Sequence, residues 1–234
     1  MARVRSVDLG SSFLSALDGV CEILLVRHGE QALASNMALA DAVDAPLTEL
    51  GRRQAAAVGE RLADDAIDAV YSSTMVRARD TGRAIAAHHD LPVTELEALG
   101  EIHLWRDLPQ ERGLVDALGP DELRRIMREG NRTRRWDAYP HAEPRDEFRS
   151  RIVGALDGIM ADHVGERVVV ACHGGVINGY VAHVIESALD APFTVHHTSI
   201  TTVRGMDELR RVVQVNDHHH VRSFQDELNP INAL

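Results

Sequence analysis

The chain has 234 residues, of which 36 are acidic and 25 are basic, so its formal net charge is −11. This length is enough to bury the core of one ordinary α/β domain. The negative charge argues against a general nucleic-acid binder. Every basic residue is an arginine, which excludes a lysine Schiff base and the lysine of a phosphate-binding P-loop.

Residues 1–20 contain no continuous apolar stretch, because charged and small residues interrupt them. We therefore expect an N-terminal extension that is not a signal peptide. No run in the chain approaches the length that spans a bilayer, so we expect no membrane partner. The two cysteines, Cys21 and Cys172, fall in predicted buried strands. Buried reduced thiols fit a cytoplasmic protein.

Apolar runs alternate with helical patterns over residues 21–234, which is typical of a single α/β domain. The predicted strands are 22–27, 67–71, 92–96, 167–172, 198–203 and 210–215. The predicted helices begin after Thr48, run from Ser73 to about His88, and cover 145–163 and 175–188. Thr48 and Ser73 are the expected N-caps of the first two helices.

Residues 105–144 interrupt this alternation and are predicted to form an insertion that is helical from Asp121 to Gly130. The insertion is rich in arginine and sets a single acid, Glu129, against Arg124, Arg125, Arg128, Arg132, Arg134 and Arg135. A solvated helix and loop explains most of these arginines. A lid would use one or two of them to hold an anionic substrate. Both interpretations stay open at this point.

Three adjacent histidines, 218–220, invite the interpretation of a metal site or a tag. Fourteen residues follow them, and three consecutive side chains cannot easily face one ion. We expect a native loop or surface segment and no metal site.

Two predicted strands end in a histidine. The first leads into Arg27-His28-Gly29-Glu30, and the fourth leads into His173-Gly174-Gly175. A histidine just past a buried strand is held rigidly, and an adjacent arginine offers a planar fork for phosphate. The pattern predicts an anion pocket in which one histidine can act as a nucleophile.

Further motifs lie between these two segments, at 46–55, at 72–81 and at Glu101. In this order the motifs resemble the histidine phosphatase superfamily, the phosphoglycerate mutase-like proteins, over about residues 21–215. The resemblance implies a three-layer α/β/α fold with a mostly parallel central sheet. It also implies a histidine acid phosphatase-type hydrolase that acts on a small phosphorylated metabolite without a metal or cofactor.

The resemblance assigns the nucleophile and the phosphate ligands. His28 would attack phosphorus with one ring nitrogen while the other donates to a backbone carbonyl, such as that of Gly29. Arg27, Arg77 and His173 would hold the phosphoryl oxygens. Arg77 lies in the first turn of a predicted helix, whose positive N-terminus points the same way.

Arg79 lies two residues after Arg77 on the same predicted helix. Two helical residues are about 200° apart around the axis, so both arginines cannot face the pocket. We expect Arg79 to form a surface ion pair.

Glu101 is the candidate general acid, which would protonate the leaving alkoxide and later deprotonate the attacking water. Glu95 and Glu97 are nearby alternatives, but the motif position favours Glu101. The family's glycine–aromatic–glycine pattern after this acid is replaced by residues 102–106. His103 is therefore free to enter the pocket.

Three further residues match family positions less specifically. Asn36 matches an asparagine that contacts phosphate or substrate, although a helix or loop cap is an equal explanation. The backbone N–H of Gly174 is a candidate phosphate contact. Glu143 lies where relatives have Gly-Glu-Ser but reads Ala-Glu-Pro here, so its role is doubtful.

Two other functions are weighed against the phosphomonoesterase. A mutase would also use His28, but the segment from Asn36 to Pro46 is short and lacks tryptophan, which disfavours phosphoglycerate mutase. A non-catalytic phospho-ligand module is disfavoured because the nucleophile, the clamp and the acid are all present. Sugar phosphates, phosphoglycerates, nucleotide-loop phosphates and phosphohistidine on a partner protein all stay open as substrates. The insertion favours a covered small-molecule pocket, and a homodimer is a general expectation.

Overall fold

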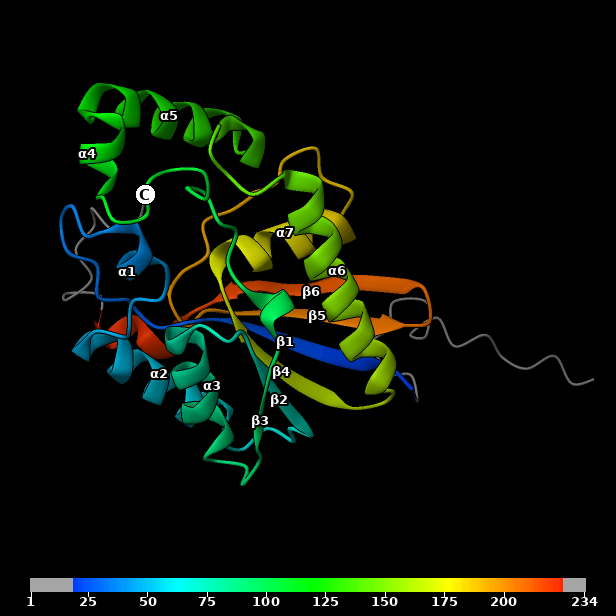
Figure 1. Ribbon diagram of the computed structural model, residues 1–234. Coiled ribbons are helices and arrows are strands. Elements are labelled where there is room, and N and C mark those ends of the chain that lie inside the picture. Colours follow the sequence, from blue (N-terminus) through cyan, green and yellow to red (C-terminus); the bar gives the residue numbers. More distant parts are fainter. Residues whose placement is uncertain (1–18, 225–234) are drawn as a thin grey trace, which may run out of the picture.

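A computed structural model describes residues 19–224, apart from the side chain of Ser223. One sheet of six strands forms the centre, in the order β3-β2-β4-β1-β5-β6 (Figure 1). The strands are β1 (Cys21–Arg27), β2 (Ala69–Ser72), β3 (Val93–Glu95), β4 (Arg167–Cys172), β5 (Ile200–Met206) and β6 (Leu209–Asp217). The first four run parallel, and β5 and β6 add an antiparallel edge.

Helices cover both faces of the sheet (Figure 1). The α-helices of the described residues are α1 (Leu39–Val43), α2 (Glu49–Leu62), α3 (Val76–Ala86), α4 (Leu114–Leu118), α5 (Pro120–Thr133), α6 (Arg145–Asp162) and α7 (Gly174–Val184). Short 3-10 turns lie at η2 (Glu97–Leu99), η3 (Trp136–Ala138) and η4 (His219–Phe224). α2 and α3 cover one face, and α6 and α7 cover the other.

The apolar residues of β1 divide between two cores. Ile23 and Leu25 belong to the core beneath α6 and α7, whereas Leu24 and Val26 belong to the core beneath α2 and α3. Successive strand side chains point to opposite faces, so a strand covered on both sides reads as a continuous apolar run. The predicted three-layer α/β/α fold is confirmed, with one strand, β5, running against the other five in a mostly parallel sheet.

The predicted strands match the observed ones within a few residues, and Thr48 caps α2 as expected, accepting from the N–H of Gly51 at 2.9 Å. The expectation that Ser73 caps the next helix is wrong. α3 begins at Val76, and its N-cap is Met75, which offers no side-chain oxygen. The backbone stays extended through Met75, and α3 ends at Ala86 rather than His88.

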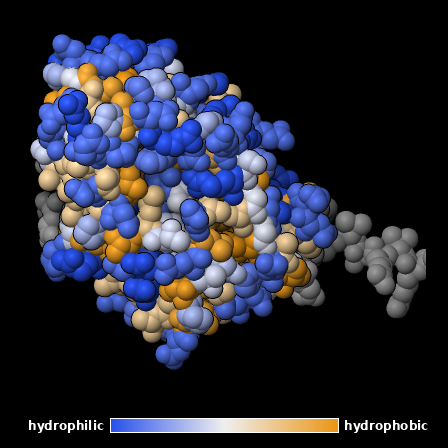
Figure 2. Space-filling view, in the orientation of Figure 1, coloured by the Kyte–Doolittle hydropathy of each residue, from blue (hydrophilic) through white to orange (hydrophobic). Residues whose placement is uncertain are grey.

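The segment 105–144 contains α4, α5 and η3, of which α4 was not predicted. The expectation of a single acid among the arginines is wrong, since Asp121 and Glu122 open α5. Three arginines pair with acids three residues earlier, in the pairs Arg124–Asp121, Arg125–Glu122 and Arg132–Glu129. These pairs are exposed, and Figure 2 shows a hydrophilic surface over this part of the molecule. For these three arginines the structure favours a solvated helix.

The last two histidines of the triplet 218–220 begin η4, and the ring of His218, just before it, stacks on that of His196 at 4.2 Å between centroids. Within residues 19–224 no group of three or more histidine, cysteine or acidic side chains is arranged to hold a metal ion. None of the helices in the same range is both long and apolar enough to cross a membrane.

Candidate active site

Two histidines meet where β1 and β4 end side by side. The strands pair in parallel with Arg27 opposite Cys172, so the next residues, His28 and His173, leave the same edge of the sheet. The N–H of His28 donates to the carbonyl of Cys172 at 2.9 Å. Both side chains are buried, and their ring centroids lie 5.1 Å apart. Neighbouring parallel strands therefore build the centre of the site.

One nitrogen of His28 is fixed by the backbone, and the other faces Arg77. Nδ1 lies 2.7 Å from the carbonyl oxygen of Gly29. A carbonyl only accepts, so Nδ1 carries the proton. Nε2 keeps its lone pair and accepts from Nε of Arg77 at 3.2 Å. Burial, His173 and the nearby arginines hold the pKa of His28 well below its usual range. The ring is therefore a neutral imidazole with an available nucleophilic nitrogen.

The loop that carries His28 is held by close backbone packing. A Cβ on Gly29 would lie 2.3 Å from the carbonyl oxygen of Gly51, so no larger residue fits there without a shift. The N–H of Gly29 donates to Oγ1 of Thr81 at 3.1 Å, and that hydroxyl donates to the carbonyl of Arg77 at 2.8 Å. Thr81 thereby ties the loop that carries His28 to the helix that carries Arg77.

Ser73 contacts one ring nitrogen of His173. Its Oγ lies 2.7 Å from Nε2 of His173 and accepts from the N–H of Met75 at 3.1 Å. In the tautomer in which the serine hydroxyl donates to Nε2, the imidazole proton lies on Nδ1. Among the described residues, Nδ1 of His173 is buried without a hydrogen-bond partner. In this tautomer it is a donor available to a phosphoryl oxygen.

Arg27 and Arg77 bring two positive charges to this edge. The guanidinium of Arg27 donates to the carbonyl of Val195 at 2.5 Å, and its Nε is buried without a partner in the described chain. Arg77 donates to the carbonyl of Val43 at 2.7 Å. Burial lowers the pKa of Arg27 to about 10, so it stays charged at neutral pH. Two desolvated cations suit a dianionic phosphoryl group.

Glu101 sits at the N-terminus of α7. One carboxylate oxygen accepts from the N–H of Gly175 at 3.1 Å, and the other accepts from its own neighbour Ile102 at 2.9 Å. A Cβ on Gly175 would lie 2.2 Å from Oε1 of Glu101, whereas one on Gly174 would have its nearest neighbour at 3.7 Å. The close approach of Glu101 to α7 therefore depends on the glycine at position 175. The phosphate contact predicted for the N–H of Gly174 stays a prediction.

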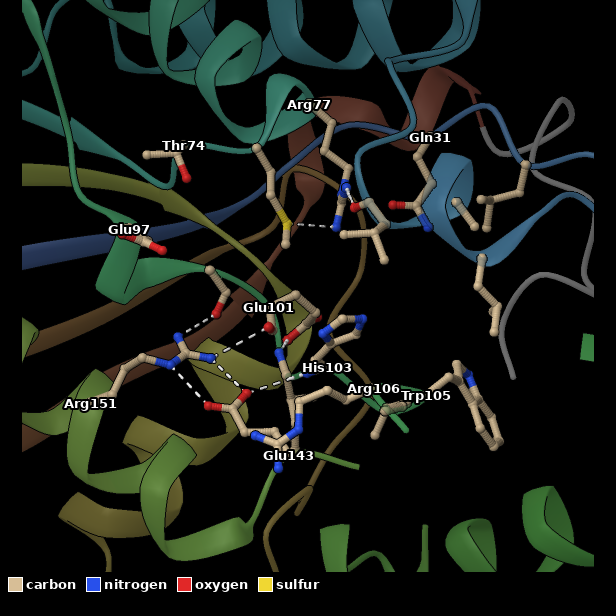
Figure 3. A pocket seen from close by; sticks show the side chains of 18 of the residues that line it. Gln31, Thr74, Arg77, Glu97, Glu101, His103, Trp105, Arg106, Glu143 and Arg151 are labelled. Carbon is tan, nitrogen blue, oxygen red and sulfur yellow. Dashed lines mark hydrogen bonds and ion pairs between the residues drawn. The ribbon is translucent and has the colours of Figure 1, made fainter. Parts of the chain in front are cut away.

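An ion pair that the sequence did not identify supports the segment of Glu101. Arg151 donates to both carboxylate oxygens of Glu143, at 3.1 and 2.9 Å. It also donates to the carbonyls of Ala98 and Gly100, at 2.9 and 2.8 Å. Figure 3 shows this arrangement beside the cavity. The sequence context left the role of Glu143 doubtful. In the structure Glu143 holds Arg151, which in turn fixes the backbone before Glu101.

A cavity of about 830 Å³ opens next to Arg77 and Glu101. Its lining comes from the loop after β1, the segment 97–106, and Leu114 of α4. His103 lies in this lining, as its place in the sequence allowed. His28 and His173 are at most 2 % exposed and lie outside the lining. The cavity is therefore on the Glu101 side of the site, where a leaving group would project.

One candidate residue lies elsewhere, Arg79 is where the sequence predicts it, and one unexpected residue lies close. Asn36 is exposed and donates to Oδ2 of Asp116 at 2.7 Å, which joins it to α4 rather than to the histidines. Arg79 lies 3.6 Å from Glu95, in the expected surface ion pair. His197, unnoticed in the sequence, has its ring centroid 5.8 Å from that of His28.

Comparisons with known proteins show the family of the chain. The model of the histidine phosphatase superfamily (branch 1) matches residues 23–218. Phosphoglycerate mutase-like protein 4 of Arabidopsis thaliana is 35% identical over 83% of this chain and 84% of its own length. The metal-independent phosphoserine phosphatase of the same plant is 30% identical, over 87% and 84% respectively.

Among solved structures, Bacillus stearothermophilus YhfR superposes with a TM-score of 0.70 at 26% identity, covering 86% of this chain and 100% of that protein. The sequence match and the structural match both extend over nearly the whole described fold. The two histidines at the ends of β1 and β4 fall inside the matched range. The chain belongs to the histidine phosphatase superfamily, in its first branch.

Proposed function

We propose that the protein is a phosphomonoesterase that hydrolyses a small phosphorylated metabolite through a phosphohistidine at His28. The observation that carries this proposal is the state of the His28 ring. Its Nδ1 proton is held by the Gly29 carbonyl at 2.7 Å, and its Nε2 faces Arg77 at 3.2 Å. A phosphoryl group bound by Arg77 would therefore present phosphorus to an unprotonated nitrogen.

In the first step, Nε2 of His28 forms a bond to phosphorus while the bond from phosphorus to the alcohol oxygen breaks. Arg27, Arg77 and the Nδ1 proton of His173 hold the equatorial oxygens and offset their charge. Glu101, in its protonated form, gives its proton to the departing alkoxide. The alcohol leaves through the cavity beside Glu101.

In the second step, water attacks phosphorus from the side that the alcohol has left. Glu101 takes a proton from this water, the bond from nitrogen to phosphorus breaks, and inorganic phosphate leaves. His28 returns to its neutral form. These steps use only side chains of this chain, which supports metal-independent chemistry, as does the relative named a metal-independent phosphoserine phosphatase.

The finer features of the prediction belong to the same proposal. We infer a histidine acid phosphatase-type hydrolase that needs no cofactor, binds neither nucleic acid nor membranes, and works in the cytoplasm. Both cysteines of the chain are free and buried, which supports a reducing compartment. A homodimer is proposed on general grounds alone.

A mutase is the second candidate, favoured by the relative named phosphoglycerate mutase-like protein 4. It would pass the phosphoryl group from His28 to another hydroxyl of the same substrate instead of to water. The two activities share the first step and differ in their products, which are inorganic phosphate for the phosphatase and an isomeric ester for the mutase.

The test is phosphate release from a panel of phosphomonoesters in EDTA, with wild type beside His28→Ala. We expect release by wild type and a loss of at least about 10³-fold in the variant, because the nucleophile is gone. Acid quenching and mass spectrometry should place a phosphoryl group on His28 in wild type. His88→Ala, at an exposed histidine two residues after α3, is the matched control and should behave as wild type.

Release of phosphate that survives His28→Ala would overturn the proposed mechanism. An isomeric ester formed without phosphate release would establish the mutase instead. Tight binding of inorganic phosphate without turnover of any ester would leave the third candidate, a binding module.

A further inference from the structure

The cavity beside Glu101 receives the part of the substrate that leaves as the alcohol. Arg77 and Glu101 border it, while the buried His28 lies on the phosphoryl side of Arg77. In an in-line displacement the leaving oxygen lies opposite the nucleophile. The residues of the cavity therefore select the alcohol, and their chemistry describes it.

Apolar side chains make up much of the lining. They include Leu39 and Ala42 of α1, Ile102, Leu104, and Leu114 of α4. A volume of about 830 Å³ lies within the range of pockets that enclose whole small molecules. The lining and the volume together favour an alcohol that is large and carries apolar surface.

Trp105 forms an aromatic wall of the cavity, on the side away from Arg151 in the view of Figure 3. Tyr139 meets it edge to face at 5.8 Å between centroids. The insertion packs closely behind Tyr139, since a Cβ on Gly130 of α5 would lie 2.3 Å from the tyrosine oxygen. Trp105 is thus held from behind and presents a flat surface on which a ring can stack.

The cavity has few cationic side chains free to bind a second negatively charged group on the substrate. Apart from Arg77, its lining cations are Arg106 and Arg151. Arg151 is already bound to Glu143 and to backbone carbonyls. Arg106 is exposed, and its carboxylate neighbours lie at 3.6 and 3.8 Å. Glu97 adds a further negative charge to the lining.

Two polar atoms in this lining, Oε1 of Gln31 and Nε2 of His103, are buried and have no hydrogen-bond partner among the described residues. A buried polar atom is costly unless a partner reaches it. A hydrogen-bonding group on the bound alcohol would satisfy the nitrogen of His103.

We propose that the substrate is the phosphomonoester of a large, uncharged, ring-bearing alcohol, whose ring stacks on Trp105 and whose polar group meets His103. This inference rests on the proposed phosphatase function and names its substrate class. It sets the chain apart from enzymes that take phosphorylated amino acids or phosphoglycerates, because those substrates carry a carboxylate on the leaving alcohol.

The test compares esters of aliphatic alcohols. Wild type is assayed for phosphate release from 2-phenylethyl phosphate, glycerol 1-phosphate, O-phosphoserine and 3-phosphoglycerate. We expect kcat/KM for the phenylethyl ester to exceed each of the others by about tenfold or more, because burying a ring contributes that much affinity. The ratio of the phenylethyl ester to glycerol 1-phosphate should fall by about tenfold in Trp105→Ala and much less in Trp105→Phe.

A second variant tests the charge argument without removing a packed ring. Leu33 lines the cavity and is 55% exposed, so Leu33→Arg should fold and add a cation to the lining. It should raise kcat/KM for 3-phosphoglycerate relative to the phenylethyl ester. Leu209→Arg, at an exposed leucine of β6, adds the same charge outside the lining and should leave both values unchanged.

A wild-type preference for O-phosphoserine or 3-phosphoglycerate over the phenylethyl ester would overturn this inference and leave the phosphatase function standing. So would a preference that Trp105→Ala does not change. Turnover that survives His28→Ala would instead count against the proposed function, which separates the two failures.

Discussion

The two halves of the site are built in different ways. The phosphoryl half of the proposed mechanism consists of Arg27, His28, Arg77 and His173, which come from the ends of β1 and β4 and from the first turn of α3. Its histidines and Arg77 are at most 4 % exposed. The alcohol half is the cavity lined by the segment 97–106, α1 and α4. Its side chains come from loops and short helices, and several are partly exposed.

In the proposed mechanism, the phosphoryl half carries out the phosphoryl transfer and the alcohol half selects the substrate. Strand ends fix the phosphoryl half, where small displacements would cost catalysis. Loops and an insertion form the alcohol half, where sequence changes alter shape at little cost to the fold. We expect substitutions in the phosphoryl half to act on every ester alike and those in the alcohol half to act on some esters only.

Among the substitutions that test this division into two halves, the replacement of Arg77 should lower kcat the most. Arg77→Ala removes a buried charged donor from beside His28, and we expect kcat to fall by about 10²- to 10³-fold for every ester. Arg79→Ala removes an arginine two residues away whose partner is Glu95, and it should leave kcat close to wild type. Steady-state kinetics on two unrelated esters would check both, and a loss confined to one ester would contradict the division into halves.

Gly175→Ala should produce the next largest effect, because this residue lies where the two halves join. A Cβ there would lie 2.2 Å from Oε1 of Glu101, so the carboxylate must move away from the leaving oxygen. We expect kcat to fall by about tenfold to 10²-fold, with a circular dichroism spectrum like that of wild type. Gly174→Ala is the control and should lose less, since its nearest neighbour would lie at 3.7 Å. Equal losses in the two variants would count against this account of Glu101.

Removing Arg151 should affect stability as well as rate. Arg151→Met leaves Glu143, whose side chain is 13% exposed, without its charge partner. We expect the free energy of unfolding to fall by about 2 kcal/mol, less than for a fully buried pair because Arg151 is itself 26% exposed. Urea titration would measure this change. Arg132→Met, which breaks the exposed pair with Glu129 on α5, should change stability little. A similar small change in Arg151→Met would show that the pair does not hold the backbone before Glu101.

The sequence predicts the phosphoryl half better than the alcohol half for a physical reason. Buried parallel strands leave long apolar runs, so the places where His28 and His173 end their strands could be predicted. Ser73, Arg151 and His197 act through contacts between segments far apart in the chain. No local periodicity marks such contacts. Serine is common at helix N-caps, which is why the sequence predicts a cap at Ser73, whereas its contact with His173 depends on the pairing of β2 with β4.

The same limit applies to the alcohol half. The departure from the family pattern at 102–106 indicated a changed wall but not its shape. The aromatic contact of Trp105 with Tyr139 joins two ends of the insertion, and the short helices α1 and α4 are too brief for a periodic signal. Asn36 is the opposite case, since its motif position predicts a substrate contact, which stays a prediction, while its side chain contacts Asp116 of α4 in the structure.

The smallest predicted effect is the contribution of His197 to the pH dependence of stability. It tests how buried the phosphoryl half is. Burial and Arg27 lower the pKa of His197 from 6.5 to about 3. In the unfolded chain this histidine binds a proton below about pH 6.5, while in the folded protein it stays neutral down to about pH 3. Its contribution to stability is therefore intact above pH 6.5 and is lost progressively as the pH falls toward 3. Between pH 6.5 and pH 5, wild type should lose about 1.5 kcal/mol more of its unfolding free energy than His197→Gln. Urea titrations at the two pH values would measure this difference. Equal losses in both proteins would mean that His197 is open to water, and that the phosphoryl half is less enclosed on the side of β5 than at the ends of β1 and β4.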